Sequence, residues 1–209
     1  SMLHGDVSKK LMNNLYPGYF PEELTHIGYV TNGVHYSTWT AKEWKELHKK
    51  YFGHNFPETQ SDFTVWDKIQ DVPDEEIFNL KQKLKVKLIE YIKQRFADNW
   101  IKRNENPKLI TEALSQFNPN ALTIGFARRF ATYKRAYLIF KNLDRLNAIV
   151  NHPEDPVQFI FAGKAHPADK GGQELIKYIV EISKRPEFIG KIMYIQNYDM
   201  NLAKMMLQG

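Results

Sequence analysis

Four cationic side chains follow a short apolar run near the middle of the chain. Residues 122–126 read Leu-Thr-Ile-Gly-Phe, a pattern typical of a buried strand. Cations then gather where the next helix is expected to begin: Arg128, Arg129, Lys134 and Arg135. Free backbone N–H groups and the helix dipole favour anions at such a place, and guanidinium groups can bind a phosphate through two hydrogen bonds. The spacing therefore predicts a phosphate site, with a solvated basic loop as the alternative.

A glycine and several polar residues follow a second apolar run, 157–162. Gly163, Lys164 and His166 come directly after it, and glycine there lets a backbone or a ligand approach closely. Open α/β sheets bind ligands at the carboxyl ends of their strands, so this loop is expected to face the same crevice as Arg129. The glycine spacing fits neither a Walker A loop nor a dinucleotide fingerprint. His166 is a candidate base, with a hydrogen-bonding turn residue as the more common alternative.

A third apolar run, 191–195, is followed by Gln-Asn-Tyr-Asp. Tyr198 is a candidate to line the crevice, whereas Asp199 is expected to cap the last helix. The seven histidines lack metal-ligand spacing, because the chain has no His-Glu-x-x-His motif and no two histidines three or four residues apart. We therefore predict no metal site.

The elements that must position these residues alternate from residue 122 onward. Apolar strands at 122–126, 157–162 and 191–195 are separated by helical patterns, which predicts parallel βαβ units and part of a Rossmann-like sheet. The expected helices in this half are 131–148, 169–184 and 199–208. The upstream half is predicted to be mainly helical, with a short strand at 27–30 and a surface loop at 52–72. Its expected helices are 3–17, 41–51 with Thr40 as the cap, 73–96 and 108–116.

Composition limits the class of protein. The chain has 209 residues, 43% of them hydrophobic, which is enough to bury a core, and its net charge of +5 favours anionic partners. It has no cysteine, and no apolar run is long enough to span a membrane, so a cytoplasmic protein is expected. Ser1 precedes Met2 as a tag-removal scar would, and the last residues resemble an unfinished helix. The chain is therefore expected to be an internal piece of a longer protein.

Four motifs in register carry a resemblance to a known family. The motifs are Thr31-Asn32-Gly33-Val34-x4-Trp39, Arg128-Arg129-x4-Lys134-Arg135, Gly163-Lys164-Ala165-x-Pro167 and Asn197-Tyr198-x3-Leu202-Ala203. In the order and spacing of these motifs the chain is similar to α-glucan (glycogen, starch or maltodextrin) phosphorylases, and their amino-acid sequence resembles the shorter, prokaryotic branch of that family.

The resemblance implies a GT-B architecture, in which two Rossmann-like domains face each other across a cleft. Residues 1–30 would be the tail of the N-terminal domain. Residues 31–118 would be the helical opening segment of the C-terminal domain, and 119–209 the first half of its Rossmann-like part. The fold class expected is therefore α/β, a partial parallel sheet preceded by a helical segment.

The resemblance also implies an activity, in which the terminal α-1,4-linked glucosyl unit of a glucan passes to inorganic phosphate. The product is glucose 1-phosphate with retained configuration, and the cofactor is pyridoxal phosphate, whose phosphate group exchanges a proton with the substrate phosphate. Roles follow residue by residue from the family pattern. Arg129 and Lys134 would hold the substrate phosphate, Arg128, Trp39 and Tyr198 would lie at the cofactor, and Asn32 would bond the 6-hydroxyl of the sugar.

Two departures from the family pattern bear on these expectations. Arg128 stands where many relatives have lysine, which keeps the charge and changes the geometry. The lysine that forms the Schiff base lies beyond Gly209 in the family, so the chain alone is expected to hold no covalent cofactor and to be inactive. Partners other than glucan and phosphate are not expected, neither nucleic acid nor membrane, although an exposed sheet edge favours self-association into a homo-oligomer.

Two other functions fit parts of the sequence. A nucleotide-sugar transferase of the glycogen synthase type shares the fold and an Arg/Lys pair for phosphate. A basic α/β module for nucleic acid or another polyanion fits the net charge, and the lysine-rich face of 81–93 is its main support. That lysine-rich face is expected to be a solvated helix surface, because aromatic residues do not interleave with the lysines.

Overall fold

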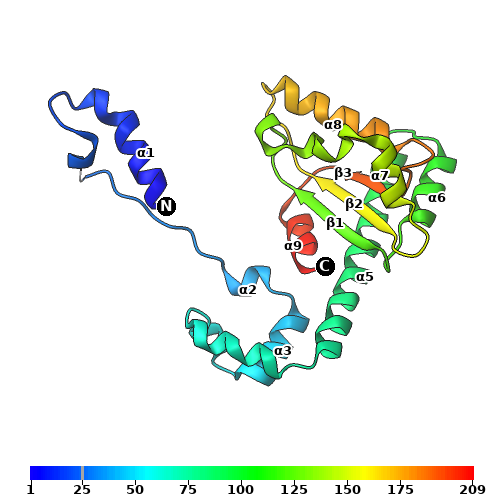
Figure 1. The fold of residues 1–209 in the computed structure, drawn as a ribbon, viewed down its shortest axis with the longest axis horizontal. Coiled ribbons are helices and arrows are strands. Elements are labelled where there is room, and N and C mark those ends of the chain that lie inside the picture. The colour runs from blue at the N-terminus through cyan, green and yellow to red at the C-terminus, as the bar shows by residue number, and fades with distance from the viewer. Residues whose placement is uncertain (25) are drawn as a thin grey trace. The chain divides into compact units, whose positions relative to one another are not determined.

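The computed structural model describes residues 1–24 and 26–209 (Figure 1). These residues form two compact units, Ser1–Trp39 and Thr40–Gly209, and each is described by itself. None of the helices in the described residues combines the length and the apolar character that crossing a bilayer requires.

The first unit is built around helix α1, Met2–Met12, which the Ser1 side chain caps. Two short 3₁₀ turns follow, Asn13–Leu15 and Pro21–Glu23, and α2 occupies Tyr36–Trp39. The predicted strand at 27–30 is wrong, since these residues are irregular. The physical reason is the lack of a partner: within the described part of the chain no strand pairs with them, and an extended segment alone cannot satisfy a ladder of hydrogen bonds.

The second unit begins with a helical segment that confirms most of the upstream predictions. Its α-helices are α3 (Lys42–Phe52), α4 (Phe56–Thr59), α5 (Asp74–Ile101) and α6 (Pro107–Gln116). Two details of the sequence prediction are wrong. Thr40 is not the cap of α3, because Ala41 occupies the N-cap and makes no side-chain bond there. The expected loop at 52–72 contains α4 and a 3₁₀ helix, Phe63–Asp71.

Aromatic packing explains why that loop is ordered. Phe52, Phe56 and Trp66 pack edge to face with centroids 4.8–5.7 Å apart, and the His48 ring stacks on Phe52 at 5.2 Å. Such aromatic pairs add to the free energy gained by burial. His48 is 7% exposed, and this burial lowers its pKa from the usual 6.5.

Helix α5 begins where the sequence predicts and ends later than expected. Three acidic residues occupy its first turn, where the helix dipole favours them. The last of these, Glu76, accepts hydrogen bonds from Tyr51 and Lys50 of α3, and these bonds lower its pKa. The helix continues past residue 96 because its buried stripe continues through Phe96 to Trp100, whose rings lie 4.3 Å apart.

Three parallel strands form the sheet, in the order β1-β2-β3. They are β1 (Leu122–Ala127), β2 (Val157–Ala162) and β3 (Ile192–Ile195), close to the predicted bounds. β1 pairs with β2 along its whole length, from Leu122 opposite Val157 to Ala127 opposite Ala162. Helices cover both faces, with α7 (Leu143–Val150) and α8 (Lys170–Ser183) on one side and α5 and α9 (Met200–Gln208) on the other (Figure 1). The predicted α/β class is confirmed.

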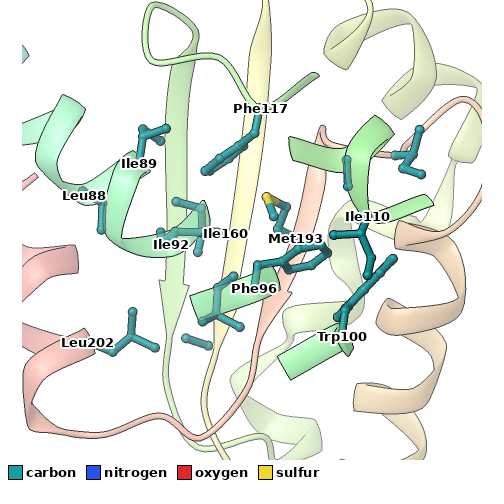
Figure 2. Close-up of a cluster of buried hydrophobic side chains, with 14 residues drawn as sticks. Leu88, Ile89, Ile92, Phe96, Trp100, Ile110, Phe117, Ile160, Met193 and Leu202 are labelled. Carbon is teal, nitrogen blue, oxygen red and sulfur yellow. The ribbon is translucent and has the colours of Figure 1, made fainter. Parts of the chain in front are cut away.

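Each face of the sheet has its own hydrophobic core. Figure 2 shows the core between the sheet and α5, where Ile92 is 0% exposed and lies near Ile160 and Leu202. The opposite core joins Phe161 of β2 to α7 and α8. β1 is less buried than predicted: Leu122 and Ile124 are 62% and 43% exposed. The reason is that β1 pairs with β2 on one edge, and no described strand pairs with the other.

The predicted helix 131–148 is wrong in its first half. Two 3₁₀ turns, Thr132–Lys134 and Ala136–Lys141, precede α7. Arg135 lies between them with φ +59°, a left-handed conformation that an α-helix cannot contain. α7 begins only at Leu143, after Asn142 has capped it through the Arg145 amide. The cations after β1 therefore lie on turns and not at an α-helix N-terminus.

The core between α5 and the sheet gives a first testable prediction. Ile92→Ala removes three carbon atoms from a fully buried site, so we expect the free energy of unfolding to fall by about 2–5 kcal/mol. Urea denaturation measures the change. Glu90→Ala, on the exposed face of the same helix, is the control and should change stability by less than about 0.5 kcal/mol. Equal effects from the two variants would contradict the packing of α5 on the sheet.

The buried His48 predicts a pH dependence of stability. Because burial lowers its pKa in the folded state, the unfolded chain binds the proton more tightly. The contribution is complete above pH 6.5 and is lost as the pH falls below that value towards the folded-state pKa. We expect the melting temperature of the wild type to fall more steeply between pH 7.5 and 5.5 than that of His48→Phe. Parallel curves for the two proteins would show that His48 does not titrate in this way.

Candidate functional site

The cationic residues predicted to bind phosphate lie at the carboxyl end of β1. Arg128 and Arg129 directly follow the last residue of the strand, and both are exposed. Lys134 ends the first 3₁₀ turn and is partly buried, with its ammonium 4.6 Å from the centre of the Tyr133 ring. We call residues 128–135 the cation loop.

Close backbone contacts hold the cation loop against the loop after β2. Phe130 is fully buried in the core beneath it, and its amide donates to the Lys164 carbonyl at 3.0 Å. A Cβ on Gly163 would lie 2.0 Å from the Arg128 carbonyl oxygen, and φ at Gly163 is +148°. A Cβ on Gly172, at the start of α8, would lie 2.3 Å from the Phe130 carbonyl oxygen. The sequence suggested that a backbone or a ligand approaches Gly163 closely, and the structure shows that it is the backbone of Arg128.

The cation loop carries positive charge without internal compensation. Residues 128–135 contain no Asp or Glu, and none of the ion pairs among the described residues involves the four cations Arg128, Arg129, Lys134 and Arg135. The three arginine side chains are exposed and free to turn towards a ligand. Such a cluster, anchored by a buried phenylalanine and left without acidic partners, favours binding of a phosphate-sized anion.

The loop after β2 gives His166 a turn role. Its Nδ1 accepts from the Ala168 amide at 3.1 Å, and its own carbonyl oxygen accepts from the Asp169 amide at 2.9 Å. Asp169 then caps α8 through the Gly172 amide at 2.9 Å. The more common alternative for a lone loop histidine therefore describes His166 best.

The third strand places Tyr198 on the same edge of the sheet. Tyr198 is partly buried and packs against the core on the α5 side. The preceding Asn197 has φ +56°, a left-handed conformation that asparagine tolerates better than most residues. Asp199 caps α9 by accepting from the Leu202 amide at 2.8 Å, as the sequence predicted, and this bond and Arg95 lower its pKa.

Arg95 of α5 holds the turn that carries Tyr198, a role that was not predicted from the sequence. Its guanidinium donates to the carbonyl oxygens of Gln196 and Asn197, and it pairs with the Asp199 carboxylate at 2.8 Å. Three contacts from one planar group fix the turn more firmly than a single lysine could. No local sequence pattern predicts this role, because Arg95 is separated from its partners by about a hundred residues. In the sequence it is one of several cations along an amphipathic helix.

The remaining predicted site residues belong to the first unit. Asn32 is exposed in the irregular segment before α2, and Trp39 is the partly buried last residue of α2. The structure thus groups Arg128, Arg129 and Lys134 in one loop, and it places Tyr198 two strands away on the same sheet edge. Among the described residues no group of three or more His, Asp or Glu side chains is placed to hold a metal ion.

The sheet edge gathers the cation loop and the turn of Tyr198 at the carboxyl ends of parallel strands, and comparison with known proteins shows the family. The family model for carbohydrate phosphorylase matches residues 1–209. The chain belongs to the carbohydrate phosphorylase family.

Individual relatives agree with this family assignment. Over all 209 residues the chain is 44% identical to a protein named maltodextrin phosphorylase from Thermococcus litoralis. It is 42% identical to glycogen phosphorylase from Aquifex aeolicus and 36% identical to glycogen phosphorylase from Mycobacterium tuberculosis. The chain spans 24–30% of the length of these curated relatives.

The contact beneath the cation loop gives a prediction. Gly163→Ala places a methyl group on the Arg128 carbonyl in a backbone conformation that alanine avoids, so we expect a loss of about 1–3 kcal/mol of stability. Chemical denaturation measures the loss. Gly125→Ala in β1 is the control, since its Cβ would meet only the mobile end of Met206 at 3.1 Å. If both variants were as stable as the wild type, the close approach of the two loops would be wrong.

Proposed function

We propose that the whole protein containing this chain is an α-glucan phosphorylase. It transfers the terminal α-1,4-linked glucosyl unit of a glucan to inorganic phosphate and releases glucose 1-phosphate with retention. The observation that carries the proposal is the cation loop: four cations without acidic partners among the described residues follow β1 at the carboxyl edge of a parallel sheet, where such sheets bind ligands. Membership of the carbohydrate phosphorylase family supports it, as do relatives named glycogen and maltodextrin phosphorylase.

Within this function we assign the substrate phosphate to Arg129 and Lys134. Arg129 offers a planar fork that can bind two phosphate oxygens, and Lys134 a compact point charge. Lys134 is partly buried against Tyr133, so its charge is less screened than that of a fully exposed lysine. Both cations stabilise negative charge that grows on the phosphate as the glycosidic bond breaks. Asn32 is proposed to bond the 6-hydroxyl of the sugar.

Pyridoxal phosphate is the proposed cofactor, and the residues present fit its phosphate group. Arg128 is exposed beside Arg129 without an acidic partner in the described chain, so a second phosphate next to the substrate phosphate would meet a cation of its own. Tyr198, on the turn that Arg95 holds, and Trp39 are proposed to lie beside the cofactor. When bound, the cofactor supplies a phosphate group able to exchange a proton with the substrate phosphate. The contribution of this chain is to hold the two anions against their mutual repulsion.

The architecture proposed for the whole protein is GT-B. The parallel sheet of residues 122–195, with helices on both faces, supports a Rossmann-like C-terminal domain. We assign 31–118 to the helical opening of that domain, 119–209 to its first half, and 1–30 to the tail of the N-terminal domain. A cytoplasmic location and a homo-oligomeric state remain predictions from the sequence.

The phosphate role of Lys134 is tested in the whole protein. With maltodextrin and inorganic phosphate as substrates, we expect the wild type to form glucose 1-phosphate. Lys134→Ala should lower kcat about 10²- to 10³-fold, because it removes a charge that stabilises the transition state. Arg145→Ala is the control, an exposed cation on α7 away from the cation loop, and should retain activity.

Two results would overturn the proposal. Full activity in Lys134→Ala would remove this lysine from the phosphate site. A wild type that forms no glucose 1-phosphate, yet extends a glucan from ADP-glucose or UDP-glucose, would make the protein a nucleotide-sugar transferase.

A further inference from the structure

A cationic depression lies at the same carboxyl edge of the sheet as the cation loop, between β3 and α8. It is a pocket of about 430 Å³, within the range that small-molecule ligands occupy. The carboxyl end of β2 contributes Gly163 and Lys164, and the carboxyl end of β3 contributes Gln196 and Asn197. None of the residues that we assign to substrate or cofactor lines it.

The charges around this pocket match a dianion. Its cations are Arg103, Lys164 and Lys177. Lys177 pairs with Glu174 at 2.6 Å, whereas neither of the other two has an acidic partner among the ion pairs of the described residues. Since Glu174 compensates the charge of Lys177, the charges of Arg103 and Lys164 are left to bind an anion. The second nearby acid, Glu181, does not line the pocket.

Polar groups of fixed orientation complete the lining. The Gln173 amide nitrogen donates to the carbonyl oxygens of His166 and Pro167, at 3.3 and 2.7 Å, which leaves its oxygen as an acceptor. The Tyr194 hydroxyl donates to the Gly163 carbonyl at 2.8 Å and keeps its lone pairs for a further donor. An acceptor pair of this kind suits the hydroxyl groups of a ligand and not its phosphate.

The wall of the pocket is rigid and partly apolar. The Arg95 guanidinium fixes the backbone of Gln196 and Asn197 through hydrogen bonds to their carbonyl oxygens. Ile176 and Val180 of α8 form an apolar side. Because hydrogen bonds fix the backbone at Gln196 and Asn197, this part of the wall needs little ordering to bind a ligand.

We propose that this pocket binds a small phosphate monoester with a hydroxylated body, at a site separate from the cation loop. Arg103 and Lys164 bind the phosphate, and Gln173 and Tyr194 accept hydrogen bonds from the hydroxyl groups. The turn 196–199 carries Tyr198 as well as the pocket residues Gln196 and Asn197. A ligand in the pocket therefore contacts the turn that positions Tyr198 at the edge where catalysis is proposed. The binding itself does not depend on the proposed activity.

The test is a binding titration of the 209-residue chain followed by NMR of its backbone amides. Ribose 5-phosphate is the probe, and ribose and inorganic phosphate are the comparison ligands. We expect saturable shifts at Gly163, Tyr194 and Gln196, and at least tenfold weaker binding in Arg103→Gln. Since Arg103 is exposed, this substitution leaves the core intact. Lys177→Glu is a second variant and should also weaken binding.

Matched controls separate the pocket from the cation loop. Arg129→Gln and Arg145→Gln remove the same charge elsewhere in the chain and should change the affinity less than twofold. Loss of binding in Arg129→Gln with retention in Arg103→Gln would place the probe in the cation loop and overturn the proposal. Equal affinity for ribose would refute phosphate recognition, equal affinity for inorganic phosphate would refute recognition of the hydroxylated body, and no saturable shift would refute the site.

Discussion

The close approach of two loops at the carboxyl edge of the sheet is the constraint on which the candidate site depends. The carbonyl oxygen of Arg128 would lie 2.0 Å from a Cβ at position 163. The carbonyl oxygen of Phe130 would lie 2.3 Å from a Cβ at position 172. Phe130 is buried beneath, and its amide bonds the next loop. Anchored in this way, the loop can present several like charges that would otherwise repel each other and spread apart.

Two hydrophobic cores hold the sheet that carries this edge. The core on the α5 side uses a buried stripe along a helix of 28 residues, and the opposite core uses α7, α8 and the turns before α7. α5 has a second role, because Arg95 reaches from it to the turn after β3. The helix that supports the sheet therefore also fixes the segment that bears Tyr198. Packing and site geometry are linked through one guanidinium group.

Positive charge at this edge falls into two places with different surroundings. The cation loop has exposed arginines and no acid, which suits anions that are also held by other groups. The pocket between β3 and α8 has walls, oriented acceptors and one carboxylate. Under the proposals made above, a phosphate at the cation loop is bound mainly by charge, whereas the ligand of the pocket is also recognised by shape and by its hydroxyl groups. The strand ends bring both places to one side of the sheet.

The sequence by itself determined the alternation of strands and helices, the bounds of the three strands within a residue or two, and the cations that follow β1. These are local properties, because apolar periodicity and turn residues act over a few positions. Only the tertiary structure decided that residues 132–134 and 136–141 form 3₁₀ turns, that residues 56–71 are ordered by aromatic packing, and that β1 is half exposed. It alone joined Arg95 to a turn a hundred residues away and brought Arg103 to the pocket of Lys164. Contacts between distant segments depend on how the elements pack, and no short stretch of sequence encodes them.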